Sequence, residues 1–138
     1  MGKYELPIDI DAFELLSARR LIEGETAACA AEAISEQGLK GLMDAIHKME
    51  ADIEEGVQAV TDKNDGDLLF HSRIASATGN SVLVSIVDQL WEGMRRPMFK
   101  AICERVFLPG NARRALADHR IIYQHIADKN PDKARDAM

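Results

Sequence analysis

Apolar residues recur at spacings of three, four and seven along most of the chain, which is the pattern of helices that each bury one face. The first predicted helix extends from Asp11 to about Glu36 and ends at Gly38, and the second continues from there to near Gly56. Residues 61–66 show no apolar periodicity and are predicted to form a polar link. The first half of the chain is therefore predicted to contain two long helices.

The second half is predicted to contain four further helices. The third carries Asp67, His71 and Ile74 along one side, and apolar stripes mark the fourth at 82–94 and the fifth at 116–126. The boundaries are predicted from residues that stop or start helices. These are Gly79 as a C-terminal cap, Ser81 as an N-cap, Pro97 as an end or kink, the 109–111 turn, and Asn130 with Pro131 as the start of a sixth helix that is cut short at Met138.

The composition indicates how these helices are combined. Hydrophobic residues make up 46% of the chain and aromatic residues only 5%, which favours helices packed on helices over a β-sandwich or barrel. The 138 residues are enough for one domain with a hydrophobic core. We therefore predict a single all-α bundle of about six helices over 11–138, preceded by a leader or linker remnant at 1–10.

The charge argues against direct nucleic-acid binding by this chain, and the lack of targeting patterns argues against a membrane or secreted protein. The net charge is −6 and acidic residues gather at 50–55, so this chain by itself would repel a phosphate backbone. The sequence has no apolar run near the ~20 residues of a membrane span and no signal-peptide pattern, and we expect a cytoplasmic protein. Cys29 and Cys103 lack metal-site spacing and are expected to be buried free thiols, with a disulfide between them as the alternative.

Asp67 and His71 are the first candidate functional pair, because a spacing of four places both on one face of a helix. His119 falls in the apolar stripe of the fifth helix and is also predicted to point inward. A carboxylate with imidazoles suits zinc, nickel or manganese. The alternative, which spacing alone favours, is that Asp67 caps its helix and His71 packs in the core. His47 and His125 are predicted to be peripheral.

Three arginines are candidates for binding an anion. Arg19, Arg95 and Arg96 can each hold a carboxylate through two N–H groups. The alternative is that they pair with nearby acids such as Glu23 or Glu92.

Four segments resemble, in the same order, those of a known protein family. They are Ala-Arg-Arg-Leu-Ile-Glu at 18–23, Asp-x-x-Phe-His-x-x-Ile-Ala-x-Ala-Thr-x-Asn at 67–80, Asp-His-x-x-Ile at 118–122 and Asn-Pro-x-x-Ala-x-x-Ala-Met at 130–138. With these segments, nearly the whole chain resembles the effector-binding (FCD) domain of GntR-family transcription regulators, FadR subgroup. Gly66, Trp91 and the segments 80–84 and 96–98 make it most similar to regulators of hexuronate utilisation.

The resemblance implies a fold and a set of site residues. The family domain is an antiparallel bundle of six or seven helices, usually dimeric, which follows a winged helix-turn-helix domain and binds small carboxylates above an internal metal. The resemblance assigns Asp67, His71 and His119 as metal ligands, with zinc as the first choice and nickel or manganese as alternatives. It places a further ligating histidine three residues after Met138. The candidate ligand-binding residues are Arg19, Arg95, Arg96 and Asn80.

We therefore expect a ligand-sensing and dimerisation domain excised from a bacterial transcription regulator. It would bind a small organic acid, such as the sugar acid hexuronate, and would contact DNA only through a winged helix domain that is absent before Lys3. No enzymatic turnover is expected. One alternative is a helical-bundle metalloenzyme, for which the sequence offers no general base beside the candidate ligands. Another is a purely structural dimerisation domain whose histidines are core residues.

Overall fold

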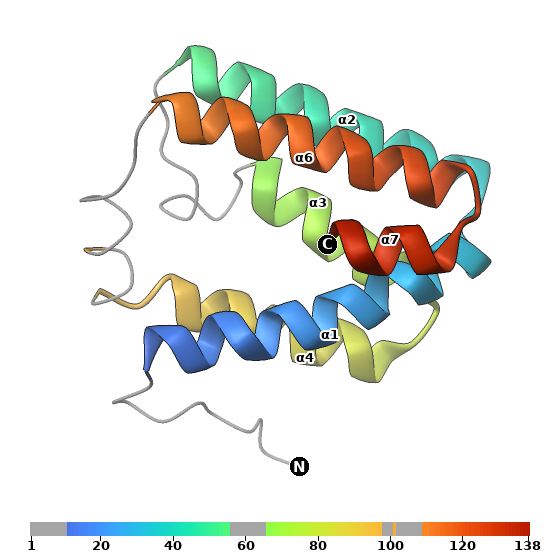
Figure 1. Ribbon diagram of the computed structural model, residues 1–138, viewed down its shortest axis with the longest axis horizontal. Coiled ribbons are helices and arrows are strands. Elements are labelled where there is room, and N and C mark those ends of the chain that lie inside the picture. Colours follow the sequence, from blue (N-terminus) through green and yellow to red (C-terminus); the bar gives the residue numbers. More distant parts are fainter. Residues whose placement is uncertain (1–10, 56–65, 98–100, 102–108) are drawn as a thin grey trace.

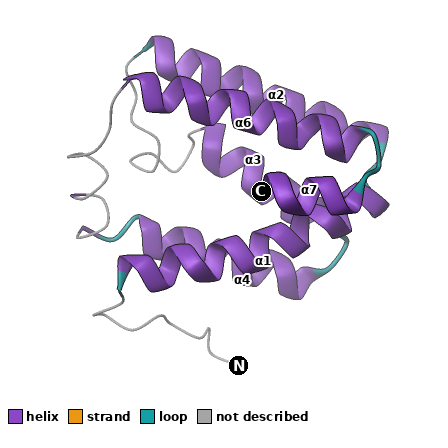
Figure 2. Cartoon of the chain, in the orientation of Figure 1, coloured by secondary structure: helices purple, strands orange, loops and turns teal. Residues whose placement is uncertain are grey.

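The computed structural model describes residues 11–55, 66–97, 101 and 109–138, and the elements in these residues are helices (Figure 1). They are α1 (Ala12–Ala33), α2 (Glu36–Glu54), α3 (Gly66–Ala77), α4 (Ser81–Met94), α6 (Pro109–Ala127) and α7 (Pro131–Ala137). No strand occurs in these ranges, so the predicted all-α bundle of about six helices is confirmed (Figure 2). Among the described helices, none is both long enough and apolar enough to cross a membrane.

The helices pack as antiparallel pairs on either side of α3. In Figure 1, α1 runs beside α4 and α2 runs beside α6, and the colours progress in opposite directions within each pair. The short helix α3 contacts α1, α2 and α4, and α7 packs on α1 and α6. The position of α3 therefore lets its side chains reach several other helices at once.

Two hydrophobic clusters form the interior, and α3 contributes to both. The larger cluster joins α1, α2, α3, α6 and α7 and includes Phe70 and Ile126, both fully buried. The smaller cluster joins α1, α3 and α4 and includes Leu15, Ala75 and Trp91. Since Phe70 and Ala75 both belong to α3, the residues between them on this helix lie where the two clusters meet.

The break between the first two helices comes earlier than predicted. Helix α1 ends at Ala33, and Ser35 is the N-cap of α2, where its hydroxyl accepts a hydrogen bond of 3.0 Å from the Gly38 amide. Gly38 lies in the first turn of α2, and a Cβ there would be 2.7 Å from Cγ1 of the buried Ile34. The prediction that Gly38 ends the first helix was wrong, because this glycine makes room for a neighbouring side chain.

The caps around α3, α4 and α7 follow the predicted residues with one exception. Gly79 adopts a φ of 70° after the end of α3, and Asn130 with Pro131 starts α7 as predicted. The N-cap of α4 is Asn80 and not Ser81, because the Asn80 side chain accepts hydrogen bonds from the first amides of that helix. Both residues are common N-caps, so residue preference did not distinguish them.

Prolines lie just after the end of α4 and at the start of α6. Helix α4 ends at Met94, before Pro97, as predicted. The predicted 109–111 turn was wrong, because α6 begins at Pro109 itself. A proline fits the first position of a helix, where its missing N–H would have no intrahelical partner.

Cys29 lies on the outside of α1 as an exposed free thiol, so the prediction that it is buried was wrong. The buried positions around it are taken by Ala27, Ala28, Ala30 and Ala31. The other predicted thiol, Cys103, lies outside the described residues, as do residues 1–10 and 61–65 of the predicted leader and polar link.

Candidate metal centre

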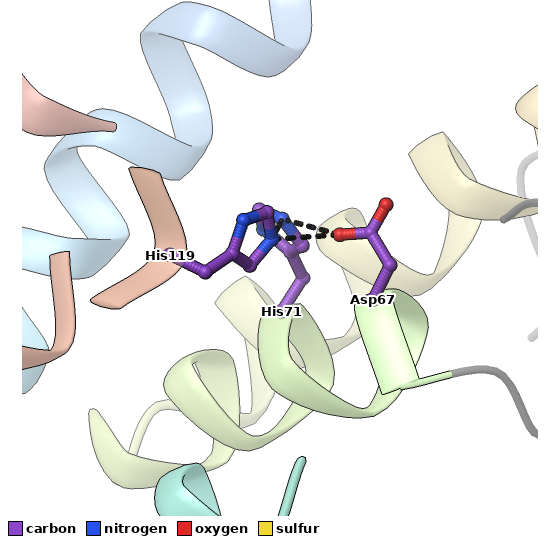
Figure 3. Close-up of side chains that lie close together, drawn as sticks. All are labelled: Asp67, His71 and His119. Atoms are coloured by element: carbon purple, nitrogen blue, oxygen red, sulfur yellow. Dashed lines mark hydrogen bonds and ion pairs between the residues drawn. The ribbon is translucent and has the colours of Figure 1, made fainter. Parts of the chain in front are cut away.

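The structure brings Asp67, His71 and His119 together inside the bundle, the first two from α3 and the third from α6 (Figure 3). The Nε2 atom of His119 lies 2.8 Å from Oδ1 of Asp67 and 3.2 Å from Nε2 of His71. The Nε2 atom of His71 lies 3.3 Å from the same Asp67 oxygen. One carboxylate oxygen and two imidazole nitrogens therefore face a common point.

The start of α3 is held tightly against α2, which places Asp67. The Gly66 amide donates a hydrogen bond of 2.8 Å to Oδ2 of Asp52 on α2. A Cβ on Gly66 would lie only 2.4 Å from the backbone nitrogen of Met49, so this close approach requires glycine. The Asp67 carboxylate, on the next residue of α3, contacts the two histidines. At this helix start, Asp52 is the residue that accepts the Gly66 amide.

Each histidine is oriented by packing and by its second ring nitrogen. His71 is 5% exposed, and its ring packs against those of Phe70 and Trp91, which belong to different core clusters. His119 is 8% exposed, and its Nδ1 donates to the Ala115 carbonyl oxygen at 2.6 Å. Both Nε2 atoms consequently point toward Asp67.

A second layer of polar groups lies behind His71. The Glu23 carboxylate on α1 accepts a hydrogen bond of 3.0 Å from the Trp91 indole Nε1 and one of 2.8 Å from Arg19 Nε. The Arg19 guanidinium also lies over the Trp91 ring, 4.5 Å from its centroid. The Nδ1 atom of His71 is 2.9 Å from Oε1 of Glu23, within ion-pair distance, although the ring is not aligned for a hydrogen bond.

From the sequence, Glu23 was predicted only as a partner for an arginine, and its place beside the histidines was missed. A signal for it is present in the sequence. Glu23 precedes Ala27, Ala30 and Ile34 by four, seven and eleven residues, so it occupies the buried stripe of α1. A carboxylate at such a position needs buried donors, and that requirement indicates a polar site.

The buried groups shift each other's ionisation. Burial alone would raise the pKa of Glu23, but the neighbouring His71 and Arg19, with the Trp91 N–H, lower it to about 2. Burial would likewise raise the pKa of Asp67, but hydrogen bonds with His119 and His71 hold it well below its usual range. For His71, burial would lower the pKa, and the two carboxylates Glu23 and Asp67 outweigh burial and raise it to about 9. Both carboxylates are therefore ionised at neutral pH.

This arrangement calls for a cation at the common point. When Nδ1 of His119 donates to Ala115 and Nδ1 of His71 carries its proton toward Glu23, the two neutral rings each present a lone pair at Nε2. These lone pairs then face the Asp67 carboxylate oxygen, and three acceptors in contact repel one another unless a proton or a metal cation lies between them. A carboxylate with two imidazoles is a donor set that fits a divalent transition metal.

The other predicted ligand-binding residues lie at the two ends of α4. Arg95 is its half-buried C-cap and Arg96 follows, whereas Asn80 is at the opposite end, where its side-chain oxygen caps the helix. Of the three predicted arginines, Arg19 is connected to His71 through Glu23. His47 is exposed and His125 is half-buried.

The chain matches a known family over most of its length. The model of the FCD domain family matches residues 14–138. Two similar proteins are the Uxu operon regulator of Haemophilus influenzae, 30% identical, and the Exu regulon transcriptional regulator of Escherichia coli, 35% identical. The alignments cover 100% and 91% of this chain but only 50% and 46% of those proteins. The chain thus spans about half the length of these relatives.

Similar results come from a more distant relative and from a solved structure. The HTH-type transcriptional regulator LutR of Bacillus subtilis is 29% identical, over 93% of this chain and 57% of that protein. The structure of E. coli McbR/YncC superposes with a TM-score of 0.72 at 18% identity, covering 91% of this chain and 60% of the other. At this identity the structural match establishes a common fold.

Proposed function

This chain belongs to the FCD domain family, the effector-binding domains of GntR-family transcription regulators, and from this we propose that it senses a small carboxylate through a bound divalent metal. The named relatives are regulators, which places the domain in a regulatory family and not in an enzyme family. The proposal therefore requires binding and a conformational response but no turnover.

The observation that carries the proposal is the convergence of Asp67 Oδ1 with Nε2 of His71 and of His119. These atoms would hold the metal, and zinc is our first choice because it accepts nitrogen and oxygen ligands together, with nickel or manganese as alternatives. Once bound, the metal would supply a positive charge and an open coordination position for an anionic oxygen. The protein's part is to hold the ligands and exclude water.

We propose an organic acid as the effector, with a sugar acid such as a hexuronate as the specific candidate. Support comes from the resemblance to hexuronate regulators and from Arg19. The Arg19 guanidinium contacts one oxygen of the Glu23 carboxylate, and His71 contacts the other. The Arg19 side chain is 17% exposed. Ionic contacts at such a partly buried position are stronger than ionic contacts at the surface. Arg95, Arg96 and Asn80 are the next candidates.

We also propose that the domain forms a homodimer and that a winged helix domain outside this chain contacts DNA. Four large apolar side chains are exposed on the neighbouring helices α1 and α4: Phe13 at 81%, Leu16 at 43%, Leu21 at 72% and Val82 at 64%. Pairing with a second copy through α1 and α4 would remove this exposed apolar surface from water. An effector that changes this pairing would change the spacing of attached DNA-binding domains.

Zinc binding and effector binding can be measured separately. Metal-stripped protein should take up zinc, and its melting temperature should rise, since a ligand at 100 times its dissociation constant stabilises a protein by about 2.7 kcal/mol. His71→Ala and His119→Ala should abolish this rise, whereas His47→Ala, at an exposed position on α2, should leave it unchanged. A wild-type protein that shows neither uptake nor a shift would indicate a structural domain with core histidines.

The zinc-loaded protein should then bind glucuronate more tightly than glucose, as measured by calorimetry. The physical reason is that only the acid supplies a charge to the metal and to an arginine. Equal binding of acid and neutral sugar would overturn the carboxylate proposal, and so would acid binding that survives His71→Ala. Chemical turnover of any tested acid would favour the metalloenzyme alternative.

A further inference from the structure

Glu23 is a charged residue in the middle of the protein, 4% exposed, and it has a partner for each oxygen. Oε2 accepts from Arg19 Nε, and Oε1 accepts from the Trp91 indole N–H. Oε1 also lies 2.9 Å from Nδ1 of His71. The carboxylate therefore joins α1, α3 and α4 at one point behind the metal centre.

Arg19 and Trp91 hold the Glu23 carboxylate in place independently of His71. An ionised carboxylate is costly to bury, and Arg19 supplies the opposite charge at 2.8 Å. The Trp91 side chain is 1% exposed and packed in the smaller core cluster, so its N–H is a rigid donor. Oε2 has its donor, Arg19, on the same helix α1, and Oε1 has its donor, Trp91, on α4. These two contacts set the plane and direction of the carboxylate.

The fixed carboxylate in turn limits how the His71 ring can bind a cation. A neutral imidazole carries one proton, and an acceptor beside Nδ1 favours the form with that proton on Nδ1. The lone pair is then at Nε2, the atom that faces Asp67 and His119. Within the described residues, the buried Nδ1 atom has no aligned hydrogen-bond partner, and Glu23 is the acceptor at its side. A rotation of the ring toward Oε1 would complete the bond.

We propose that Glu23 is a positioning residue for the metal centre: held by Arg19 and Trp91, it keeps the His71 proton on Nδ1 and presents Nε2 to the metal. This inference rests on the proposed metal-binding function. It adds a residue that never contacts the metal but sets the orientation and the basicity of one of its ligands, as carboxylates behind ligating histidines do.

The first test is the zinc dissociation constant, measured by competition with a chelator. Glu23→Gln keeps the size of the side chain and should weaken zinc binding by about 10- to 100-fold, the usual effect of losing such a partner. Glu23→Asp keeps the charge but withdraws it by one methylene, so it should not restore the affinity. If Asp restores wild-type affinity, charge alone acts and the positioning role is overturned. The matched control is Glu25→Gln on the same helix, whose carboxylate pairs with Arg135 at the surface and should not affect zinc binding.

The second test is the His71 N–H proton, observed by ¹H–¹⁵N NMR of the imidazole nitrogens and assigned by its loss in His71→Ala. The wild-type protein should show a slowly exchanging Nδ1–H with and without zinc. In Glu23→Gln this proton should exchange faster both with and without zinc. A loss of packing elsewhere in the protein would not change the exchange of this one proton. A His71 ring that binds zinc through Nδ1 in the wild type would overturn the inference.

The two proposals can fail separately. If wild-type protein binds no zinc while its Nδ1–H is protected only when Glu23 is present, the metal-binding function fails and the Glu23–His71 contact stands. If wild type and Glu23→Gln bind zinc equally and show the same Nδ1–H exchange, the metal centre stands and the role of Glu23 fails. Should Glu23→Gln not fold, Trp91→Phe removes one donor to Glu23 and leaves all three ligands. It should then weaken zinc binding and speed the exchange of the same proton.

Discussion

The ionisable residues of the buried centre link the folding of this domain to pH. In the metal-free protein His71 has a pKa of about 9, against 6.5 for an ordinary histidine, because Glu23 and Asp67 outweigh the effect of burial. A raised imidazole pKa stabilises the folded state fully below 6.5, and the stabilisation is lost as the pH rises through 9. For Glu23, with a pKa lowered to about 2, the stabilisation is present above 4.5 and is lost as the pH falls toward 2.

We therefore expect the melting temperature, measured in a chelating agent, to fall between pH 6.5 and 9. His71→Ala should remove most of this fall, while His47→Ala at the surface should keep it. A melting temperature that stays level or rises over this interval in the wild type would contradict the charged His71 in the metal-free state.

The helix start at Gly66 shows how the position of an element controls the centre. A Cβ at this residue would lie 2.4 Å from Met49 N and 2.8 Å from the Ala45 carbonyl oxygen, both backbone atoms of α2. Gly66→Ala must therefore push α3 away from α2 and weaken the Asp52 contact that holds the start of α3.

We expect Gly66→Ala to lower the free energy of unfolding by about 1–3 kcal/mol, the usual cost of overpacking, and to weaken zinc binding. The control is Gly41→Ala on α2, where a Cβ would meet Arg73 Cδ at an ordinary 3.6 Å. That substitution should be neutral or stabilising, because alanine favours a helix over glycine by about 1 kcal/mol. Denaturant unfolding measures the free energy of unfolding of both variants. Equal free energies for the two would contradict the tight packing at Gly66.

At the scale of the whole molecule, the exposed apolar residues of α1 and α4 are where we expect the proposed dimer interface. Phe13 and Leu21 on α1 and Val82 on α4 are exposed, and their apolar surface would be removed from water in a dimer. Leu21→Glu or Val82→Glu should raise the dimer dissociation constant at least about tenfold, since burying an unpaired charge is costly.

Sedimentation equilibrium over a range of concentrations measures this effect. The control is Ile121→Glu, which places the same charge at an apolar position on α6 that is 50% exposed. It should leave association unchanged. A wild-type domain that is monomeric at every concentration, or equal weakening by all three substitutions, would contradict an interface on α1 and α4.

Much of the element structure could be predicted from the chain alone, because apolar periodicity and caps act between residues close in sequence. The all-α fold, the start of α7 at Asn130 and Pro131, and the shared face of Asp67 and His71 all depend on such local spacing. The errors in element boundaries at Gly38 and at the 109–111 segment were also local. A glycine can end a helix or make room for a neighbouring side chain, and a proline can form a turn or begin a helix. The neighbouring side chain decides for Gly38, and the position at the helix start decides for Pro109.

The centre itself could be predicted only in part. Helical spacing pairs Asp67 with His71, but His119 is 48 residues further along the chain than His71, and the distance between them is set by the packing of α6 against the rest of the bundle. Only the tertiary structure decided that Trp91 and His71 meet at one carboxylate oxygen of Glu23. Periodicity determines which side of a helix is buried, whereas the residue it meets there depends on how separate helices dock.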